Sequence, residues 1–238
     1  TGPELAYKMF KHVSEMNILF KIEEVNNVVK EKDLFKVTTN KSEYTTKSVI
    51  VSSGRSPKKT PFEEKVSTLK LSRCAICDAP LYKDKDVVVL GGGDSSVEES
   101  IYLANISKNV KIISRSEIKG KLKSELESYS NIEVIENANI EDIKFDDDVY
   151  KLIVNGKEII ANGVFSYIGF TTSTGYLENL GVNMENGYII TSDGSTNIAG
   201  LYACGDIIKK SLYQIVTAVS EGAKCAVLAN NYIRGLNK

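Results

Sequence analysis

The alternation of apolar and polar residues divides much of the chain into two series of elements that follow the same order. Each series begins with a predicted helix and continues with four predicted strands separated by polar turns. Both end in a strand closed by a glycine, Gly54 in the first series and Gly169 in the second. When the same order of elements occurs twice in a chain with a long spacing between the copies, two related domains are predicted. The first series is a helix at 4–16 and strands at 18–23, 25–30, 34–39 and 44–54; the second is a helix at 118–129 and strands at 132–136, 140–145, 149–154 and 157–169.

The second series has a hairpin signal and an additional βαβ unit. Asn155-Gly156, between two alternating strands, is the strongest short hairpin signal in the chain. An additional βαβ unit precedes the helix of this series, whereas the first series begins directly at its helix. We therefore expect a homologous βαβ unit to lie upstream of Thr1 and to be absent from this polypeptide. The additional unit consists of a strand at 86–90, a glycine turn at 91–93, a helix at 94–104 and a strand at 110–114.

The glycine turn of this βαβ unit predicts dinucleotide binding. In VVVLGGGDSSVEE an apolar strand precedes Gly91-x-Gly93 and a helix follows it. Glycine lets the backbone turn tightly and approach a pyrophosphate, whose charge is met by free N–H groups and by the helix dipole. Ser96 occupies the third glycine position and is small enough to keep helix and strand close. The alternative interpretation is a turn with a structural role alone.

The end of the next strand predicts which dinucleotide is bound. Strand 110–114 runs into Ser114-Arg115-Ser116, where a doubly wound unit reads the adenosine ribose. An arginine at this place is typical of recognition of a 2′-phosphate, so Arg115 favours NADPH. The alternative is an arginine that faces solvent at a strand end.

Composition and charge point to no charged partner. Of the 238 residues, 42% are apolar and 26% are charged, and the net charge is −1, so neither nucleic acid nor an anionic membrane is indicated. There is no apolar run of about eighteen residues and no secretory amino terminus, so we expect no membrane span, no export and a cytoplasmic location. Four cysteines in a chain of this length do not make a disulfide scaffold. Cys204 and Cys225, far apart in sequence, are expected to fill the core as small apolar residues.

Cys74 and Cys77 form a CxxC pair that predicts redox chemistry. A zinc site would need two further ligands, and the sole histidine, His12, is distant in sequence, so we expect no metal. A redox dithiol needs two sulfurs close enough to bond and one that is accessible as thiolate. CxxC at a turn or a helix start provides both. Asp78 could move the proton that thiol–disulfide exchange requires, or it could cap a helix.

Four motifs in order resemble the low-molecular-weight thioredoxin reductases, over the whole chain. They are the CxxC-Asp, GGGDS, "GLYACGDI" and "YQIVTAVSEGAKCA". The resemblance implies an α/β fold of two related Rossmann-like domains that bind FAD and NAD(P), each with a parallel sheet plus an antiparallel β-meander. It implies an FAD domain at 1–56 and 168–238, incomplete at its amino-terminal part, and an NAD(P)H domain at 57–167 that carries the redox cysteines.

The same resemblance implies a role for each motif. Cys77 would approach the flavin, Cys74 would attack the partner disulfide, and Asp78 would be the acid–base residue. Electrons would pass from NADPH through FAD and the cysteine pair to thioredoxin or a related small disulfide protein. The implied cofactor-binding residues are Gly91, Gly93, Asp94, Ser95, Ser96 and Arg115 for the dinucleotide, and Gly205, Asp206, Gln214, Ile215 and Val216 for FAD.

Two departures from the family pattern keep alternatives open. The amino-terminal GxGxxG unit that grips the ADP half of FAD is not in this polypeptide, so a non-catalytic dinucleotide-binding fragment is one alternative. Where the family usually has His-Arg-Arg and a further arginine, this chain has Ser114-Arg115-Ser116 and Gly120, so NADH or ferredoxin is an alternative donor. Family members are usually homodimers and rotate one domain against the other, here through linkers near 55–57 and 167–170.

Overall fold

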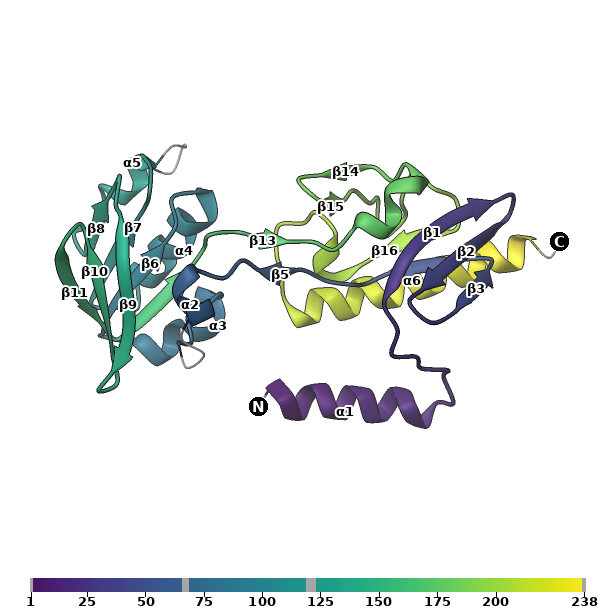
Figure 1. Cartoon of the computed structure of the whole chain (residues 1–238), viewed down its shortest axis with the longest axis horizontal. Helices are drawn as coiled ribbons and strands as arrows, with labels where there is room; N and C mark the ends of the chain where they lie inside the picture. Colours follow the sequence, from purple (N-terminus) through teal and green to yellow (C-terminus); the bar gives the residue numbers. More distant parts are fainter. Residues whose placement is uncertain (1, 66–68, 119–122, 237–238) are drawn as a thin grey trace. The chain divides into compact units, whose positions relative to one another are not determined.

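The computed structural model describes residues 2–65, 69–118 and 123–236 (Figure 1). The chain divides into two compact units: unit 1 contains the residues up to 55 and those from 172 onward, and unit 2 contains residues 56–171. Each unit has its own hydrophobic core. Among the described residues, no helix combines the length and the apolar character needed to cross a membrane.

A four-stranded parallel sheet, in the order β12-β6-β7-β8, forms the centre of unit 2. Successive side chains of a strand point to opposite faces, so Val87 and Val89 join one core cluster while Val88 and Leu90 join another. Both faces of the sheet are covered, which explains why β6 is apolar at successive positions. The strands are β6 (Asp86–Leu90), β7 (Asn109–Ile113), β8 (Ile132–Ile135) and β12 (Gly163–Ser166).

Different elements cover the two faces of this sheet. Helix α4 (Asp94–Ala104) packs Val97 and Leu103 into the cluster that contains Val87 and Val89. An antiparallel meander, in the order β11-β10-β9, packs its apolar side chains against the other face. The turn between β10 and β11 is Asn155-Gly156, with φ of 48° and 73°, so the predicted hairpin is confirmed. The meander strands are β9 (Ile140–Asp146), β10 (Val149–Val154) and β11 (Lys157–Ala161).

Short elements complete unit 2. The antiparallel pair β5 and β13 joins the two segments through which the chain enters and leaves the unit. Among the described residues, three short helices lie between β5 and β6, and a fourth lies between β7 and β8. These elements are β5 (Ser56–Pro57), α2 (Pro61–Lys65), α3 (Ala75–Asp78), η1 (Ala79–Tyr82), α5 (Lys123–Leu126) and β13 (Phe170–Thr171).

Unit 1 repeats part of this plan. A three-stranded antiparallel meander, β1-β2-β3, accompanies a parallel pair, β16 and β4. Its core includes the fully buried Phe35, Leu177 and Ile189. Cys204 and Cys225 are also buried, as predicted, in a small cluster between β16 and the long helix α6. The elements are α1 (Gly2–Glu15), β1 (Val25–Glu31), β2 (Leu34–Thr39), β3 (Glu43–Thr46), β4 (Val49–Val51), η2 (Gly175–Leu180), β14 (Met184–Glu185), β15 (Tyr188–Ile189), β16 (Leu201–Ala203), η3 (Gly205–Ile207) and α6 (Ile215–Leu236).

The predicted strand at 18–23 is wrong. The segment has no regular structure, and Leu19 and Ile22 are highly exposed. Alternating apolar residues suit a strand, but a strand also needs a neighbour with which to pair. Within the described part of unit 1 the parallel sheet contains only β16 and β4, and 18–23 joins neither. Helix α1 before it likewise has no buried residue.

Two long predicted strands are each divided in the structure. The segment 44–54 contains the end of β3 and all of β4, and the chain changes sheet at Lys47-Ser48. The segment 157–169 contains β11 and β12, with the change at Asn162. The two halves of each segment pair with different strands, β3 with β2 and β4 with β16 in the first, and β11 with β10 and β12 with β6 in the second, so the division depends on pairing partners. The predicted helix at 118–129 is helical only in α5; its positions 119–122 lie outside the described residues.

Candidate redox centre and dinucleotide-binding turn

The vicinal cysteines lie at the start of α3 and are joined by a disulfide bond. Cys74 is the N-cap residue with an extended backbone, and the N–H of Cys77 donates to its sulfur at 3.2 Å. Cys77 is exposed and Cys74 is half-buried, whereas Ala75 between them is fully buried. The pair is therefore held at the surface of unit 2 by a turn whose inner side is packed into the core.

Asp78 belongs to the same turn. Its carboxylate accepts a hydrogen bond of 2.6 Å from the hydroxyl of Ser72, and that hydroxyl accepts the N–H of Cys74 at 3.3 Å. Although Asp78 directly precedes η1, its side chain makes no capping hydrogen bond there. This arrangement favours the proton-transfer interpretation over the helix-cap interpretation, because the carboxylate is joined through one hydroxyl to the redox turn.

An ion pair involves Arg73, the residue directly before Cys74. Arg73 contacts Glu63 at 2.6 Å and also donates to the carbonyls of Leu71 and Ser72. Glu63 in turn forms a capping box with Thr60, whose N–H and hydroxyl both donate to the carboxylate. The sequence analysis missed this group. The signal that could have revealed it is Thr60-x-x-Glu63, the pattern of a capping box at a helix start.

A phenol and a carboxylate contact the first turn of α3. The Ala75 N–H donates to Oη of Tyr167 at 2.7 Å, and that hydroxyl donates to Glu99 at 3.3 Å. Burial raises the pKa of Glu99, and the hydrogen bond from Tyr167 opposes this. Burial also raises the pKa of Tyr167, and the charge of Glu99 adds to the rise. No sequence-based prediction included Tyr167 or Glu99, because 92 and 68 residues separate Tyr167 from its two partners.

The glycine turn connects β6 to α4 in a conformation that requires glycine. Gly91 has a φ of 142°, and a Cβ there would lie 2.6 Å from the carbonyl oxygen of Tyr167. A Cβ at Gly92 would lie 2.1 Å from Oγ of Ser114, so the middle glycine is needed as well. Gly93 is the N-cap of α4, and a Cβ there would meet nothing within 4 Å. Open space therefore borders the start of an 11-residue helix, which suits a pyrophosphate.

The three residues after the turn divide between surface and core. Asp94 and Ser95 are exposed in the first turn of α4, whereas Ser96 is fully buried. The Ser96 hydroxyl donates to the carbonyl of Gly93 at 2.6 Å, and its Cβ would lie 3.2 Å from a Cβ at Gly91. Ser96 thus keeps helix and strand close, as its small size predicted.

Arg115 follows β7 and is exposed. Because β6 and β7 are parallel neighbours, with Leu90 opposite Ile113, their carboxyl ends meet at one edge of the sheet. Arg115 and the glycine turn therefore lie at the same edge, where a doubly wound unit binds its ligand. Gly120, at which the family usually has an arginine, lies outside the described residues.

The predicted residues of unit 1 lie around η3 and the start of α6. Gly205 has a φ of 78°, and its N–H donates to Glu221 at 2.8 Å. Asp206 lies 3.8 Å from Arg55 and 3.6 Å from Lys210, and Lys210 also contacts Glu221. No sequence-based prediction included Glu221, Lys210 or Arg55. Lys210 and Glu221 lie within 16 residues of Gly205, whereas Arg55 comes from a distant segment that no local spacing could have grouped with them.

The first residues of α6 present apolar side chains to the surface. Ile215 is 62% exposed and Val216 is 72% exposed, and the N–H of Gln214 donates to the hydroxyl of Thr217. An apolar surface at the positive end of a 22-residue helix fits a flat ring that carries partial negative charge.

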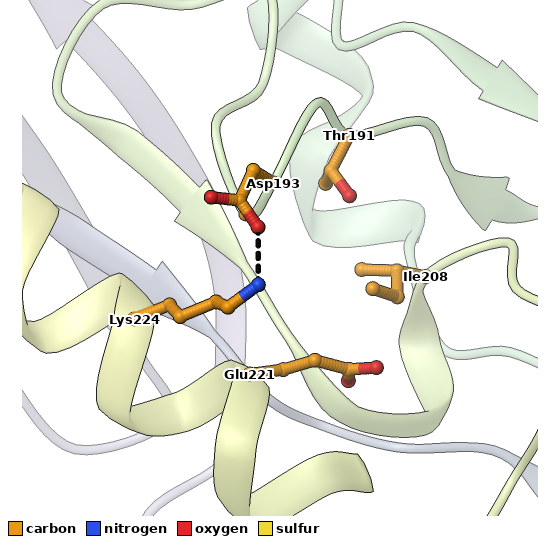
Figure 2. A pocket seen from close by; sticks show the side chains of 6 residues that line it. Thr191, Asp193, Ile208, Glu221 and Lys224 are labelled. Carbon is orange, nitrogen blue, oxygen red and sulfur yellow. Dashed lines mark hydrogen bonds and ion pairs between the residues drawn. The ribbon is translucent and has the colours of Figure 1, made fainter.

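A cavity of about 210 Å³ lies beside this group. Figure 2 shows Glu221 and Lys224 extending toward it from α6, with Lys224 paired to Asp193 at 2.5 Å. None of the predicted site residues lines it. Its lining residues are Thr191, Asp193, Gly194, Ile208, Glu221 and Lys224.

The structure thus brings the predicted residues together in three groups. In unit 2, Cys74, Cys77 and Asp78 share one turn, and the glycine turn shares a sheet edge with Arg115. In unit 1, Gly205 and Asp206 are linked to α6 through Glu221, five residues after Val216.

Comparison with known proteins agrees with this chemistry. Residues 3–222 match the family model described as pyridine nucleotide-disulphide oxidoreductase. The chain is 33% identical to the thioredoxin reductase of Bacillus subtilis (strain 168), covering 100% of this chain and 79% of the relative. It is 34% identical to the thioredoxin reductase of Peptoclostridium acidaminophilum, covering 98% of this chain and 80% of the relative.

A solved structure shows the same fold. The crystal structure of thioredoxin reductase from Streptococcus pyogenes MGAS5005 matches with a TM-score of 0.90 and 31% identity, over 99% of this chain and 81% of that chain. The predicted fold class, two Rossmann-like domains with parallel and antiparallel sheets, is confirmed. The chain therefore belongs to the pyridine nucleotide-disulphide oxidoreductases and, within them, to the low-molecular-weight thioredoxin reductases.

Proposed function

We propose that this protein is an FAD-dependent thioredoxin reductase in which the Cys74–Cys77 pair passes electrons from NADPH to the disulfide of thioredoxin. The observation that carries the proposal is the disulfide at the exposed start of α3, in the same unit as a glycine turn that suits a dinucleotide. Thioredoxin is assigned as the partner because two relatives are named thioredoxin reductase.

The two cofactors are assigned to different parts of the chain. Residues 1–56 and 168–238 are assigned to FAD, and residues 57–167 to NAD(P)H. Bound FAD would supply two-electron transfer between reduced nicotinamide and a disulfide. The residues assigned to the dinucleotide are Gly91, Gly93, Asp94, Ser95, Ser96 and Arg115; those assigned to FAD are Gly205, Asp206, Gln214, Ile215 and Val216.

The chain's own side chains perform the exchange with thioredoxin. The thiolate of Cys74 attacks one sulfur of the partner disulfide, which forms a mixed disulfide and releases the other partner sulfur as thiolate. The thiolate of Cys77 then attacks the Cys74 sulfur, so the Cys74–Cys77 disulfide forms and the second partner sulfur leaves. Asp78 passes protons between the turn and the leaving thiolates. Two electrons and two protons thereby move to thioredoxin.

A thiol–disulfide exchange assay tests this proposal directly. The chain is reduced with dithiothreitol, freed of the reagent and mixed with oxidised thioredoxin. We expect the thioredoxin to gain two thiols for each disulfide that re-forms at Cys74 and Cys77, because exchange conserves electrons. Thiol labelling and mass spectrometry measure both proteins. A reduced chain that keeps its thiols while thioredoxin stays oxidised contradicts the proposal.

Arg115 is expected to determine the preference for NADPH over NADH. In the Arg115→Ala variant, NADPH affinity should fall about tenfold, since a charge-assisted hydrogen bond to the 2′-phosphate is lost, while NADH affinity stays unchanged. Titration calorimetry with each dinucleotide measures both. Lys111→Ala is the control, because Lys111 lies on β7, the strand before Arg115, and pairs with Glu133. If the affinities for NADPH and NADH fall equally in Arg115→Ala, the role of Arg115 is contradicted. If the wild type binds neither dinucleotide, ferredoxin is favoured as the electron donor.

We also assign a homodimer and a cytoplasmic location to the protein. The support is the usual state of the family and, for the dimer, the exposed apolar side chains of α1, which has no buried residue. Sedimentation analysis tests the dimer, and cell fractionation tests the location.

A further inference from the structure

The short helix that carries the cysteines depends on contacts from outside itself. Helix α3 has only four residues, too few for helical stability of its own. The N–H of Ala75 belongs to the first turn, where backbone N–H groups have no partner within the helix. Ala75 is fully buried, so an unpaired N–H at this position would be costly. This N–H donates to the Tyr167 hydroxyl at 2.7 Å, and it also interacts with the Glu99 carboxylate, where it opposes the rise in pKa that burial causes.

Tyr167 is itself fixed to the dinucleotide-binding βαβ unit. Its N–H donates to the carbonyl of Leu90 at 2.8 Å, and its carbonyl occupies the space that a Cβ of Gly91 would need. Its side chain packs against the core cluster of α4 and β6. The tyrosine therefore joins the βαβ unit to the redox turn.

Glu99 completes the arrangement from α4. Its carboxylate accepts a hydrogen bond of 3.3 Å from the Tyr167 hydroxyl. The hydroxyl oxygen is thereby directed to the Ala75 N–H. A hydroxyl that donates to a carboxylate is a better acceptor, so the two hydrogen bonds strengthen each other. The other charged groups that act on this pair are Glu98, beside Glu99, and Asp78, on the redox turn.

We propose that Tyr167 and Glu99 form a positioning pair that holds the first turn of α3, and with it the two sulfurs, in the geometry for disulfide formation. The inference rests on the redox role proposed above for Cys74 and Cys77. Holding the two sulfurs in place removes part of the entropy cost of forming the bond. The pair should therefore raise the equilibrium constant for disulfide formation without touching either sulfur.

The dithiol–disulfide equilibrium of the full chain tests this. The chain is equilibrated at pH 7 with known ratios of reduced to oxidised dithiothreitol, then alkylated and analysed by mass spectrometry. Tyr167→Phe keeps the ring but removes the hydroxyl, and the equilibrium constant for disulfide formation should fall roughly two- to tenfold, the effect of one buried hydrogen bond. Glu99→Ala should give a smaller fall, because the Tyr167 hydroxyl still accepts from Ala75 but loses the carboxylate that orients it. Glu99→Gln keeps an oxygen that accepts from Tyr167, so it should stay within about twofold of wild type.

A double variant tests whether the two residues act as one unit. In the combined Tyr167→Phe and Glu99→Ala variant, the equilibrium constant should fall by less than the product of the two single effects, because Glu99 acts on the Ala75 N–H largely through the Tyr167 hydroxyl that the first change removes. Tyr150→Phe is the matched control: it removes a tyrosine hydroxyl that donates to the Lys70 carbonyl, in the same unit. Glu98→Ala is the control for Glu99, since Glu98 is exposed.

The outcomes separate this inference from the proposed function. A Tyr167→Phe chain with the wild-type equilibrium constant, or a Tyr150→Phe chain with an equal fall, overturns the positioning role and leaves the redox role standing. A wild-type chain in which Cys74 and Cys77 show no reversible two-electron couple overturns the proposed function itself.

Discussion

Replacement of Cys74 by serine is expected to abolish the transfer of reducing equivalents to thioredoxin, by at least about a thousandfold. The expectation follows from the structure of the turn. Cys74 is the N-cap of α3, and the N–H of Cys77 donates to its sulfur at 3.2 Å, so a thiolate there has a backbone donor in place. A serine hydroxyl at this position cannot form a disulfide with the partner. The measurement is the thiol content of thioredoxin after mixing with the pre-reduced variant.

Replacement of Cys77 should have a different result. In Cys77→Ser, the Cys74 thiolate can still attack, but no second sulfur resolves the product, so the mixed disulfide with thioredoxin should accumulate. Mass spectrometry detects it as a covalent complex of the two proteins. Cys225→Ser is the control, because Cys225 is a fully buried thiol in unit 1. Accumulation in Cys74→Ser and not in Cys77→Ser would reverse the assigned roles.

The second large effect is expected at the glycine turn. Gly91→Ala should lower the free energy of unfolding by roughly 2–4 kcal/mol, because alanine is strained at a positive φ and its Cβ would collide with a backbone carbonyl. That carbonyl belongs to Tyr167, and the Cβ would lie only 2.6 Å from its oxygen. Urea denaturation measures the loss. Dinucleotide affinity should fall as well, since the turn must shift to relieve the collision.

Gly93 supplies the matched comparison. Its φ is −88°, and a Cβ there meets nothing within 4 Å, so Gly93→Ala should leave the free energy of unfolding nearly unchanged. The added methyl group occupies space where the pyrophosphate would approach, so NADPH affinity should fall roughly tenfold. A Gly93→Ala chain that binds NADPH like the wild type would contradict dinucleotide binding at this turn. A Gly91→Ala chain of unchanged stability would contradict the geometry of the turn.

Local sequence was sufficient for the elements that carry most of the chemistry. Strand β6, the glycine turn and α4 were predicted with the bounds that the structure shows, because hydrophobic periodicity and glycine position act within about twenty residues. The CxxC pair was predicted at a turn or a helix start, and the structure places it at the N-cap of α3. The hairpin at Asn155-Gly156 was predicted because its two residues adopt positive φ readily.

The predictions failed where the outcome depended on neighbours distant in the chain. The segment 18–23 has the pattern of a strand, but pairing decides whether a strand forms. The divisions of 44–54 and 157–169 were missed, because each half of these segments pairs with a strand from another part of the chain.

The sequence by itself determined the family, the order of the elements and the redox and glycine motifs, since these follow from residues close together in the chain. Only the tertiary structure decided what surrounds the motifs: the Tyr167 hydroxyl on Ala75, the Glu63 carboxylate on Arg73 and the Glu221 carboxylate on Gly205. The physical reason is the range of the forces involved. Backbone propensity acts over one or two turns, whereas a buried N–H takes whichever acceptor the folded chain brings within about 3 Å.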